Sequence, residues 1–285
     1  MRAMKRFLAH ALSTCLGLAI ATSAVAGGYM RSGGETFVGV GLKLDYNDSF
    51  FDKSGERQHG GCDSGWSMPL FVDHGLSYYT NVFASTSVRY KDCPGDKAWS
   101  LSDSEVGLRR RVDPLSNDWV WEASLFVPTS RLGAMRSSDA AAWGYNLGLH
   151  WRDRPDPYVL DDTRDPLAGH WDAGFGVRGW AKHLPLEGWA YVTYSRPLGL
   201  TNWALGHRAW TFSATLDWRQ SLTRTHATAP AVDAHDQFHL LDLRVSFEYP
   251  LSRFERFGLS FSQSLLGENR DDSSGITVRY GKTFR

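Results

Sequence analysis

Alternation of apolar and polar residues is clearest in the last eleven residues of the chain, 275–285. A period of two is typical of a β-strand with one apolar face and one polar face. Lys282 interrupts the apolar row near its end, where a long basic side chain can reach water. The pattern predicts an amphipathic strand that ends in an aromatic residue. Its apolar positions are Ile276, Val278, Tyr280 and Phe284.

The same alternation recurs from residue 35 onward. Turn-forming residues such as His74-Gly75 separate the segments, and loops are predicted at 153–169, 223–235 and 267–273. Most segments have about ten or more residues, enough to cross a bilayer when tilted by about 45°. The predicted strands cover 35–51, 57–73, 76–91, 101–112, 119–127, 143–152, 170–181, 189–196, 208–222, 241–249, 259–265 and 275–285.

Strands that follow one another in this way can close into an antiparallel barrel, and an even number lets both termini lie on the periplasmic side of a bacterial outer membrane. The rival interpretation is a soluble β-sandwich, which also alternates, but the predicted strands are long for a sandwich. We therefore predict an all-β fold, a closed antiparallel transmembrane β-barrel of about twelve strands.

Composition supports the barrel. The chain has 12 Trp, 11 Tyr and 15 Phe, yet only 42% of its residues are hydrophobic. Many aromatic residues at modest hydrophobicity are expected when alternate residues face lipid and aromatic girdles lie at both interfaces. Past residue 26, no apolar run approaches the length of a transmembrane helix, which argues against a helical membrane protein.

The first 26 residues have the composition of a secretory signal, with a basic head, an apolar run over 7–20 and small residues at 24–26. A lipoprotein signal ending at Cys15 is the alternative, but Thr14 fits it poorly. We expect a signal peptide over 1–26, a short Gly-rich periplasmic lead over 27–34 and a single barrel domain over 35–285. Removal of three basic residues with the signal changes the formal charge from 0 to −3. No basic tract indicates a nucleic-acid partner.

Two cysteines, Cys62 and Cys93, follow the predicted signal. An oxidising compartment makes a disulfide the default expectation for such a pair. The two lie a few residues out of register in the predicted hairpin, so the loop after Tyr90 would have to fold back for them to bond. Two isolated cysteines without CxxC spacing do not indicate a metal site.

Charged residues of both signs lie on the polar faces of the predicted strands, which should line the lumen. They are interpreted either as a lattice of salt bridges that stiffens the wall or as a transverse field across a narrow channel. Lys43, Asp45, Arg111 and Arg152 share these faces. The candidate lumen residues are Arg89, Asp103, Glu105, Arg109, Glu122, His150, Asp172, Arg178, Asp217, Arg219, Asp242, Arg244 and Glu248.

No catalytic or cofactor-binding constellation is evident. A lipid hydrolase would need a His and a Ser close together on the lipid-facing side near the outer leaflet, whereas His150 is predicted to face inward in the periplasmic half of its strand. His235, Asp236 and His239 are suitable metal ligands, but a loop with exposed histidines is the commoner explanation of such a group. We predict no enzyme, no metal site and no cofactor.

Two resemblances refine this interpretation. A terminal amphipathic strand with Tyr280 and Phe284 resembles the assembly signal of outer-membrane β-barrels, which implies the barrel-assembly machinery as a partner. Four segments match, in the same order along the chain, the motifs of a group of outer-membrane proteins that this sequence resembles. They are Gly33–Gly39, His74–Leu76, Leu101–Arg109 and the terminal strand. Members of this group are described as transporters of the phenol meta-pathway type and XagA-like barrels beside exopolysaccharide genes. None of the shared motifs is catalytic, so no functional residue is carried over.

The sequence thus leads to three hypotheses for an outer-membrane protein in contact with lipid and lipopolysaccharide. The first is a channel or transporter for small molecules, including hydrophobic or aromatic ones. The second is an accessory barrel for envelope or exopolysaccharide export, with a plugged lumen and a periplasmic partner. The third, which we disfavour, is a lipid-modifying enzyme.

Overall fold

The structure is a computed structural model of the chain. The predicted signal, residues 27–29 of the predicted lead and the predicted loop over 223–235 lie outside the residues that it describes. It describes residues 30–52, 54–59, 64–93, 96–101, 104–113, 119–127, 143–153, 169–180, 186–200, 208–222, 239–268 and 270–285.

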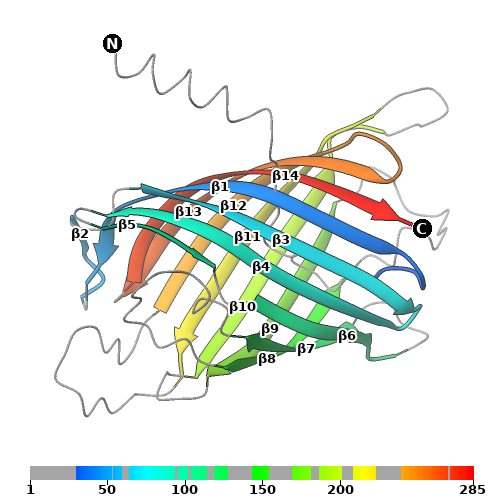
Figure 1. Cartoon of the computed structure of the whole chain (residues 1–285), viewed down its shortest axis with the longest axis horizontal. Helices are drawn as coiled ribbons and strands as arrows, with labels where there is room; N and C mark the ends of the chain where they lie inside the picture. The colour runs from blue at the N-terminus through cyan, green and yellow to red at the C-terminus, as the bar shows by residue number, and fades with distance from the viewer. Residues whose placement is uncertain are drawn as a thin grey trace.

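Within these residues the regular structure is entirely β (Figure 1). The strands are β1 (Thr36–Phe51), β2 (Arg57–His59), β3 (Ser64–Ser77), β4 (Thr80–Cys93), β5 (Asp96–Leu101), β6 (Ser104–Arg111), β7 (Trp119–Val127), β8 (Gly144–Arg152), β9 (His170–Trp180), β10 (Glu187–Pro197), β11 (Thr211–Ser221), β12 (His239–Pro250), β13 (Glu255–Glu268) and β14 (Arg270–Phe284).

Twelve of the described strands form a closed antiparallel barrel, which confirms the predicted fold class. Each of the twelve pairs with its neighbours in chain order, and β14 returns to pair with β1, from Thr36 opposite Phe284 to Phe51 opposite Arg270. The short strands β2 and β5 pair with β1 and β4 outside this ring of twelve. We call the end that carries the start of β1 and the end of β14 the terminal end, and the opposite end the loop end.

The predicted turn at His74-Gly75 is wrong. Strand β3 continues to Ser77, and the turn into β4 lies at Tyr78-Tyr79. Gly75 serves a close approach instead, because a Cβ atom there would lie 2.2 Å from the carbonyl oxygen of Ser32. The glycine thus lets the N-terminal segment, Met30 to Glu35, pack against β3.

The predicted loop over 267–273 is also wrong. β13 runs to Glu268 and β14 starts at Arg270, where it pairs with Phe51 of β1. The apolar alternation is absent over these residues, but the backbone pairing continues without it. A strand that extends beyond lipid needs no apolar face, so hydropathy underestimates its length.

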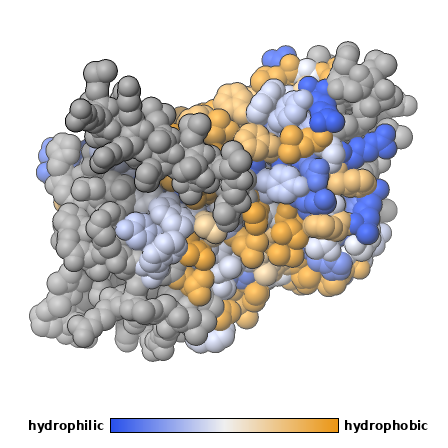
Figure 2. All heavy atoms as spheres, turned by 45° about the horizontal axis from the view of Figure 1, so that its top comes forward, coloured by the Kyte–Doolittle hydropathy of each residue, from blue (hydrophilic) through white to orange (hydrophobic). Residues whose placement is uncertain are grey.

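The outer face of the barrel is apolar. Leu147, Phe175 and Ile276 expose 50%, 55% and 45% of their surface, and Figure 2 shows apolar side chains gathered on this face. Such exposure suits lipid-facing residues of a transmembrane barrel. Among the described residues, no helix is long and apolar enough to cross a membrane.

Aromatic contacts lie near both ends of the strands. Trp171 packs on Tyr194 at 4.9 Å between ring centroids, towards the terminal end. At the loop end, Trp66, Tyr90 and Trp99 form a cluster with centroids 4.7 to 6.0 Å apart. Two such groups match the aromatic girdles expected at the two interfaces of a membrane.

Inward aromatic rings lie flat over glycines of neighbouring strands. A Cβ atom at Gly107 would lie 2.4 Å from the Phe83 ring, and one at Gly176 would lie 2.5 Å from the Trp189 ring. Because these strands carry glycine at the contact, the rings can lie along the wall. The glycines therefore shape the lumen.

We expect Gly176→Ala to destabilise the barrel by about 1–3 kcal/mol, because the added methyl group meets both the Trp189 ring and the backbone oxygen of Leu147. Gly258→Ala is the control, since its Cβ atom would find ordinary contacts at 3.5 Å or more. Urea unfolding in lipid vesicles measures both variants. Equal stability would contradict the close packing of the Trp189 ring.

Candidate functional site

The inner wall of the barrel has two unlike parts. On the first part, made by β3 to β8 and the terminal-end half of β9, inward polar side chains are buried, with Asn81, Asp73 and Asp172 exposed by 0%, 2% and 2%. On the second part, centred on β11 and β12, the Arg219 side chain is 39% exposed. None of the twelve residues of β12, all of which the structure describes, is buried. We call these the packed wall and the open wall.

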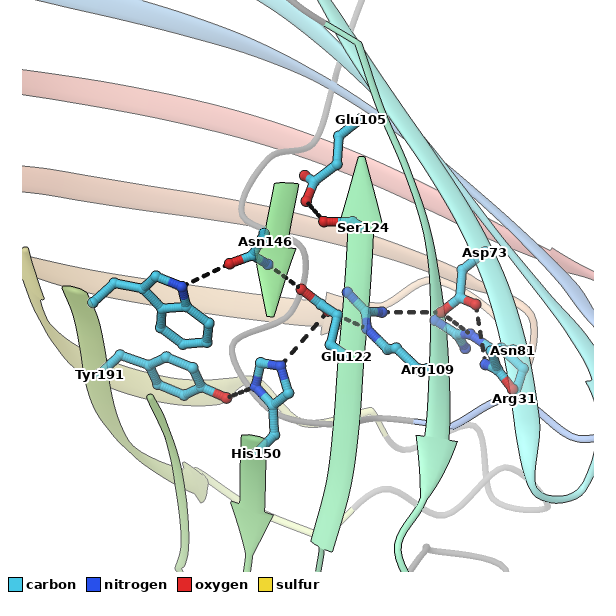
Figure 3. Close-up of polar contacts among 11 residues, drawn as sticks. Arg31, Asp73, Asn81, Glu105, Arg109, Glu122, Ser124, Asn146, His150 and Tyr191 are labelled. Carbon is cyan, nitrogen blue, oxygen red and sulfur yellow. Dashed lines mark hydrogen bonds and ion pairs between the residues drawn. The ribbon is translucent and has the colours of Figure 1, made fainter. Parts of the chain in front are cut away.

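Arg109 lies at the centre of the packed wall (Figure 3). Its Nε donates to Glu122 Oε2 at 2.7 Å, and its Nη1 lies 3.5 Å from Asp73 Oδ2. Asn81 Nδ2 donates to the other Asp73 oxygen, Oδ1, at 3.0 Å. One buried cation therefore bridges two buried carboxylates from different strands, which compensates their desolvation.

The network continues from Glu122 on β7 to side chains of β8 and β10. Asn146 Nδ2 donates to Glu122 Oε1 at 3.0 Å, and His150 Nε2 lies 3.6 Å from Glu122 Oε2. The second ring nitrogen of His150, Nδ1, shares a hydrogen bond of 2.8 Å with the Tyr191 hydroxyl. Trp189 Nε1 donates to Asn146 Oδ1 at 2.7 Å. Side-chain contacts thus join the packed wall from β3 to β8 and connect it to Tyr191 and Trp189 on the adjoining β10.

Aromatic faces complete the environment of the cations. The Arg109 guanidinium lies 4.3 Å from the Phe83 ring centroid, and the Arg31 guanidinium lies 4.3 Å from that of Phe37. Arg31 Nε also lies 3.9 Å from Asp73 Oδ2. These contacts hold the N-terminal segment against the packed wall.

The open wall carries charges with fewer close partners. Arg219 Nε donates to Asp217 Oδ1 at 3.0 Å, and Arg178 Nη1 lies 4.0 Å from Glu187 Oε2. Asp242 Oδ1 accepts from the Ser264 hydroxyl at 2.8 Å. The charges of this wall are therefore partly hydrated as well as partly paired.

The other predicted lumen residues are distributed over both walls. Glu105 accepts a 2.5 Å hydrogen bond from Ser124, and Asp172 accepts one of 2.5 Å from Arg152. Glu248 pairs with Arg256 at 3.0 Å near the terminal end. Arg89 is exposed near the loop end. Asp103, Cys62 and the Cys93 side chain lie outside the described residues, so the disulfide stays a prediction.

Sequence reasoning missed Arg31, Asp73 and Asn81. Asp73 is the last residue of the predicted strand 57–73, because the turn was predicted directly after it, at His74-Gly75. Arg31 precedes the first strand, where no periodicity exists to assign a face. Arg279 on β14 alternates with the apolar Val278 and Tyr280, so the period of two could have added it to the lumen set.

The terminal strand has the predicted apolar outer row. Phe284 is 48% exposed. Lys282, which interrupts the row, pairs with Glu255 at 3.0 Å, and the Tyr280 hydroxyl donates to the same carboxylate at 2.9 Å. A cation on the outer face is thus neutralised beside the terminal end. The assembly-signal role of Tyr280 and Phe284 stays a prediction.

The predicted histidine group is only partly described. His239 Nδ1 lies 3.0 Å from Glu268 Oε2, while His235 and Asp236 lie outside the described residues. In the described part of the chain, no group of three or more His, Cys, Asp or Glu side chains is arranged to hold a metal ion.

No protein-family model matches the chain, and no curated protein matches it in sequence. Solved structures do match. The COG4313 outer membrane channel from Pseudomonas putida F1 is similar with a TM-score of 0.65 at 12% identity, over 93% of this chain and 100% of that chain. The translocator domain of autotransporter NalP from Neisseria meningitidis gives 0.54 at 14% identity, over 98% of each chain. The chain has the fold of an outer-membrane β-barrel.

We expect Arg109→Met to cost about 3–5 kcal/mol of stability, because it leaves the buried Glu122 and Asp73 carboxylates without their shared cation. Arg256→Met is the matched control, since its pair with Glu248 is about half exposed and should contribute at most about 1 kcal/mol. Urea unfolding in vesicles gives both values. Similar losses in the two variants would show that Arg109 does not organise the packed wall.

Proposed function

We propose that this protein is an outer-membrane channel for small molecules. One observation carries the proposal: within a closed barrel, the charged side chains of the open wall remain partly exposed. Arg219 and Asp217 side chains are 39% and 24% exposed, whereas Arg109 and Glu122 across the barrel are 5% and 8% exposed.

The contrast between the walls supports a hydrated path. Ionised groups that are neither hydrated nor paired are costly, so a dry lumen would require close pairing on every wall, as on the packed wall. On the open wall, Arg244 makes no hydrogen bond or ion pair with any residue that the structure describes, although its charge interacts with those of Asp217 and Asp242. Charges lining a water-filled path select solutes by their own charge and dipole.

An aromatic surface beside this wall supports solutes with a flat or apolar part. The rings of Trp189 and Tyr191 are nearly parallel, 5° apart, with centroids 6.2 Å apart. Trp189 is the register partner of Arg219, and Tyr191 is that of Asp217. We therefore include aromatic molecules among the solutes, in line with the resemblance to transporters of the phenol meta-pathway type and XagA-like barrels. The fold shared with the Pseudomonas putida channel supports the same proposal.

A second candidate is an accessory barrel for envelope or exopolysaccharide export, acting with a periplasmic partner and without catalysis. The packed wall favours it, because buried contacts from Arg31 to Tyr191 fill one side of the lumen. In either case we propose that a signal over 1–26 directs export, that the assembly machinery inserts the barrel and that the barrel then contacts lipid and lipopolysaccharide. Unchanged lipid A and phospholipid in mass spectra, with and without the protein, would agree with the absence of catalysis.

Planar-bilayer recording of the refolded full chain tests the channel. We expect steady single-channel openings, with a conductance that rises with salt, because the open wall admits hydrated ions. Heat-modifiable migration on gels first establishes that the barrel is folded. A folded barrel that stays silent at low and high salt would overturn the channel proposal and favour the accessory role, to be followed by co-purification of a periplasmic partner.

A further inference from the structure

Four inward arginines form a row across the open wall. They are Arg178 on β9, Arg219 on β11, Arg244 on β12 and Arg279 on β14, and we call them the arginine row. Successive members lie close enough for their charges to interact, Arg178 with Arg219, Arg219 with Arg244 and Arg244 with Arg279. Acids of the wall interact with them as well, namely Glu187, Asp217, Asp242 and Glu248. Four like charges in a row that crosses β9 to β14 repel one another, unless groups of opposite charge compensate them.

Strand register shows the direction of the row. Arg178 is level with Ser221 through Glu187, and Arg219 lies two residues from Ser221 towards the terminal end. Arg244 lies four residues beyond Leu240, the partner of Arg219. Arg279 likewise lies four residues beyond Gly275, which is level with Arg244 through Ser262. Each step is an even number of residues towards the terminal end, so all four side chains share the inner face.

Acids of this wall pair with only part of the row, and Glu187 Oε2 lies 4.0 Å from the terminal Nη1 of Arg178. Asp217 is bonded by the Nε atom of Arg219, which leaves the two terminal nitrogens of that guanidinium outside the pair. Asp242 is held by Ser264, and Glu248 by Arg256. An arginine side chain is also longer than an aspartate or glutamate side chain, so the guanidinium groups extend further from the wall than the carboxylates.

Unused donors point to a ligand. Arg244 makes no hydrogen bond or ion pair with the described residues. Arg279 donates from Nη2 to the Ser246 hydroxyl at 2.9 Å, but its buried Nε has no partner. The buried Nε of Arg178 has none either. A guanidinium presents a planar set of donors that matches a carboxylate or a phosphate in bidentate fashion.

We propose that the arginine row is a binding track for small organic anions that contain a carboxylate or phosphate group. Such an anion would pass along the lumen from one guanidinium to the next. This inference rests on the proposed channel function and names its substrate class. Several weak sites in sequence suit conduction, since each must bind the anion well enough to admit it and weakly enough to release it.

The test is the reversal potential of the refolded full chain in a planar bilayer, under a roughly tenfold KCl gradient at low total salt, where screening is weak. We expect chloride to be more permeant than potassium, and acetate to carry current when it replaces chloride. Arg244→Gln should lower the anion-to-cation permeability ratio about twofold or more, because the row loses one of its two inner charges. Arg244→Lys keeps the charge and should keep a chloride preference.

Arg110→Gln is the matched control. Arg110 is exposed and alternates with the inward Arg109 and Arg111, so the same substitution there removes a charge from the outer face. Its permeability ratio should equal that of the unsubstituted protein. All variants are first shown to be folded by heat-modifiable migration.

The outcomes separate the two proposals. A conducting barrel that prefers potassium, or one whose ratio is unmoved by Arg244→Gln, would overturn the anion track and leave the channel standing. A folded barrel without conductance would overturn the channel and the track together. A ratio that changes equally in Arg244→Gln and Arg110→Gln would show that net charge acts instead of the row, and would also overturn the track.

Discussion

Backbone hydrogen bonding is the constraint on which this structure depends. In lipid, an unpaired N–H or C=O group costs several kcal/mol, so a sheet that crosses the membrane must have no free edge. The pairing of β14 with β1 removes the edge, and it does so over nearly the full length of both strands. Closure then divides every strand into an apolar outer face and an inner face that lipid never touches. Alternate residues of each strand are therefore polar, because only on the inner face can a charged side chain be hydrated or paired.

The inner face satisfies its charges in two different ways. On the packed wall, Arg109 joins Asp73 and Glu122, and aromatic rings cover its remaining surface. On the open wall, Arg178 and Arg219 each pair with one acid, and Arg244 forms no hydrogen bond or ion pair with the residues that the structure describes. The same residue types therefore act as internal structure on one side and as a surface for solutes on the other. The difference lies in what surrounds them: large rings lie over glycines along the packed wall, while short hydroxyl side chains such as Thr215, Ser260 and Thr277 lie buried between the longer charges of the open wall.

Periodicity predicted the barrel because the membrane imposes it on alternate residues. Strand β7 was predicted with both its bounds, and the outward placement of Trp119 and Leu125 follows from the same alternation. Where residues do not face lipid, the apolar alternation predicted the structure less well. The hairpin of β13 and β14 extends beyond its apolar part, and Gly75 resembles a turn residue although it allows close packing. Alternation also assigns a face but not a partner, so it could not show that Arg109 would bridge two acids or that Arg244 would form no ion pair with a described acid.

The glycines beneath the inward rings have a consequence for how such a wall can change over evolution. Phe37 fills the space over Gly281, Phe83 that over Gly107, and Trp189 that over Gly176, in each case from another strand. A ring and its glycine therefore share one volume. A larger residue on one strand must be matched by a smaller one on its neighbour, so the shape of the lumen is inherited as pairs of positions. New solute preferences would then arise by exchange within such pairs more readily than by single substitutions.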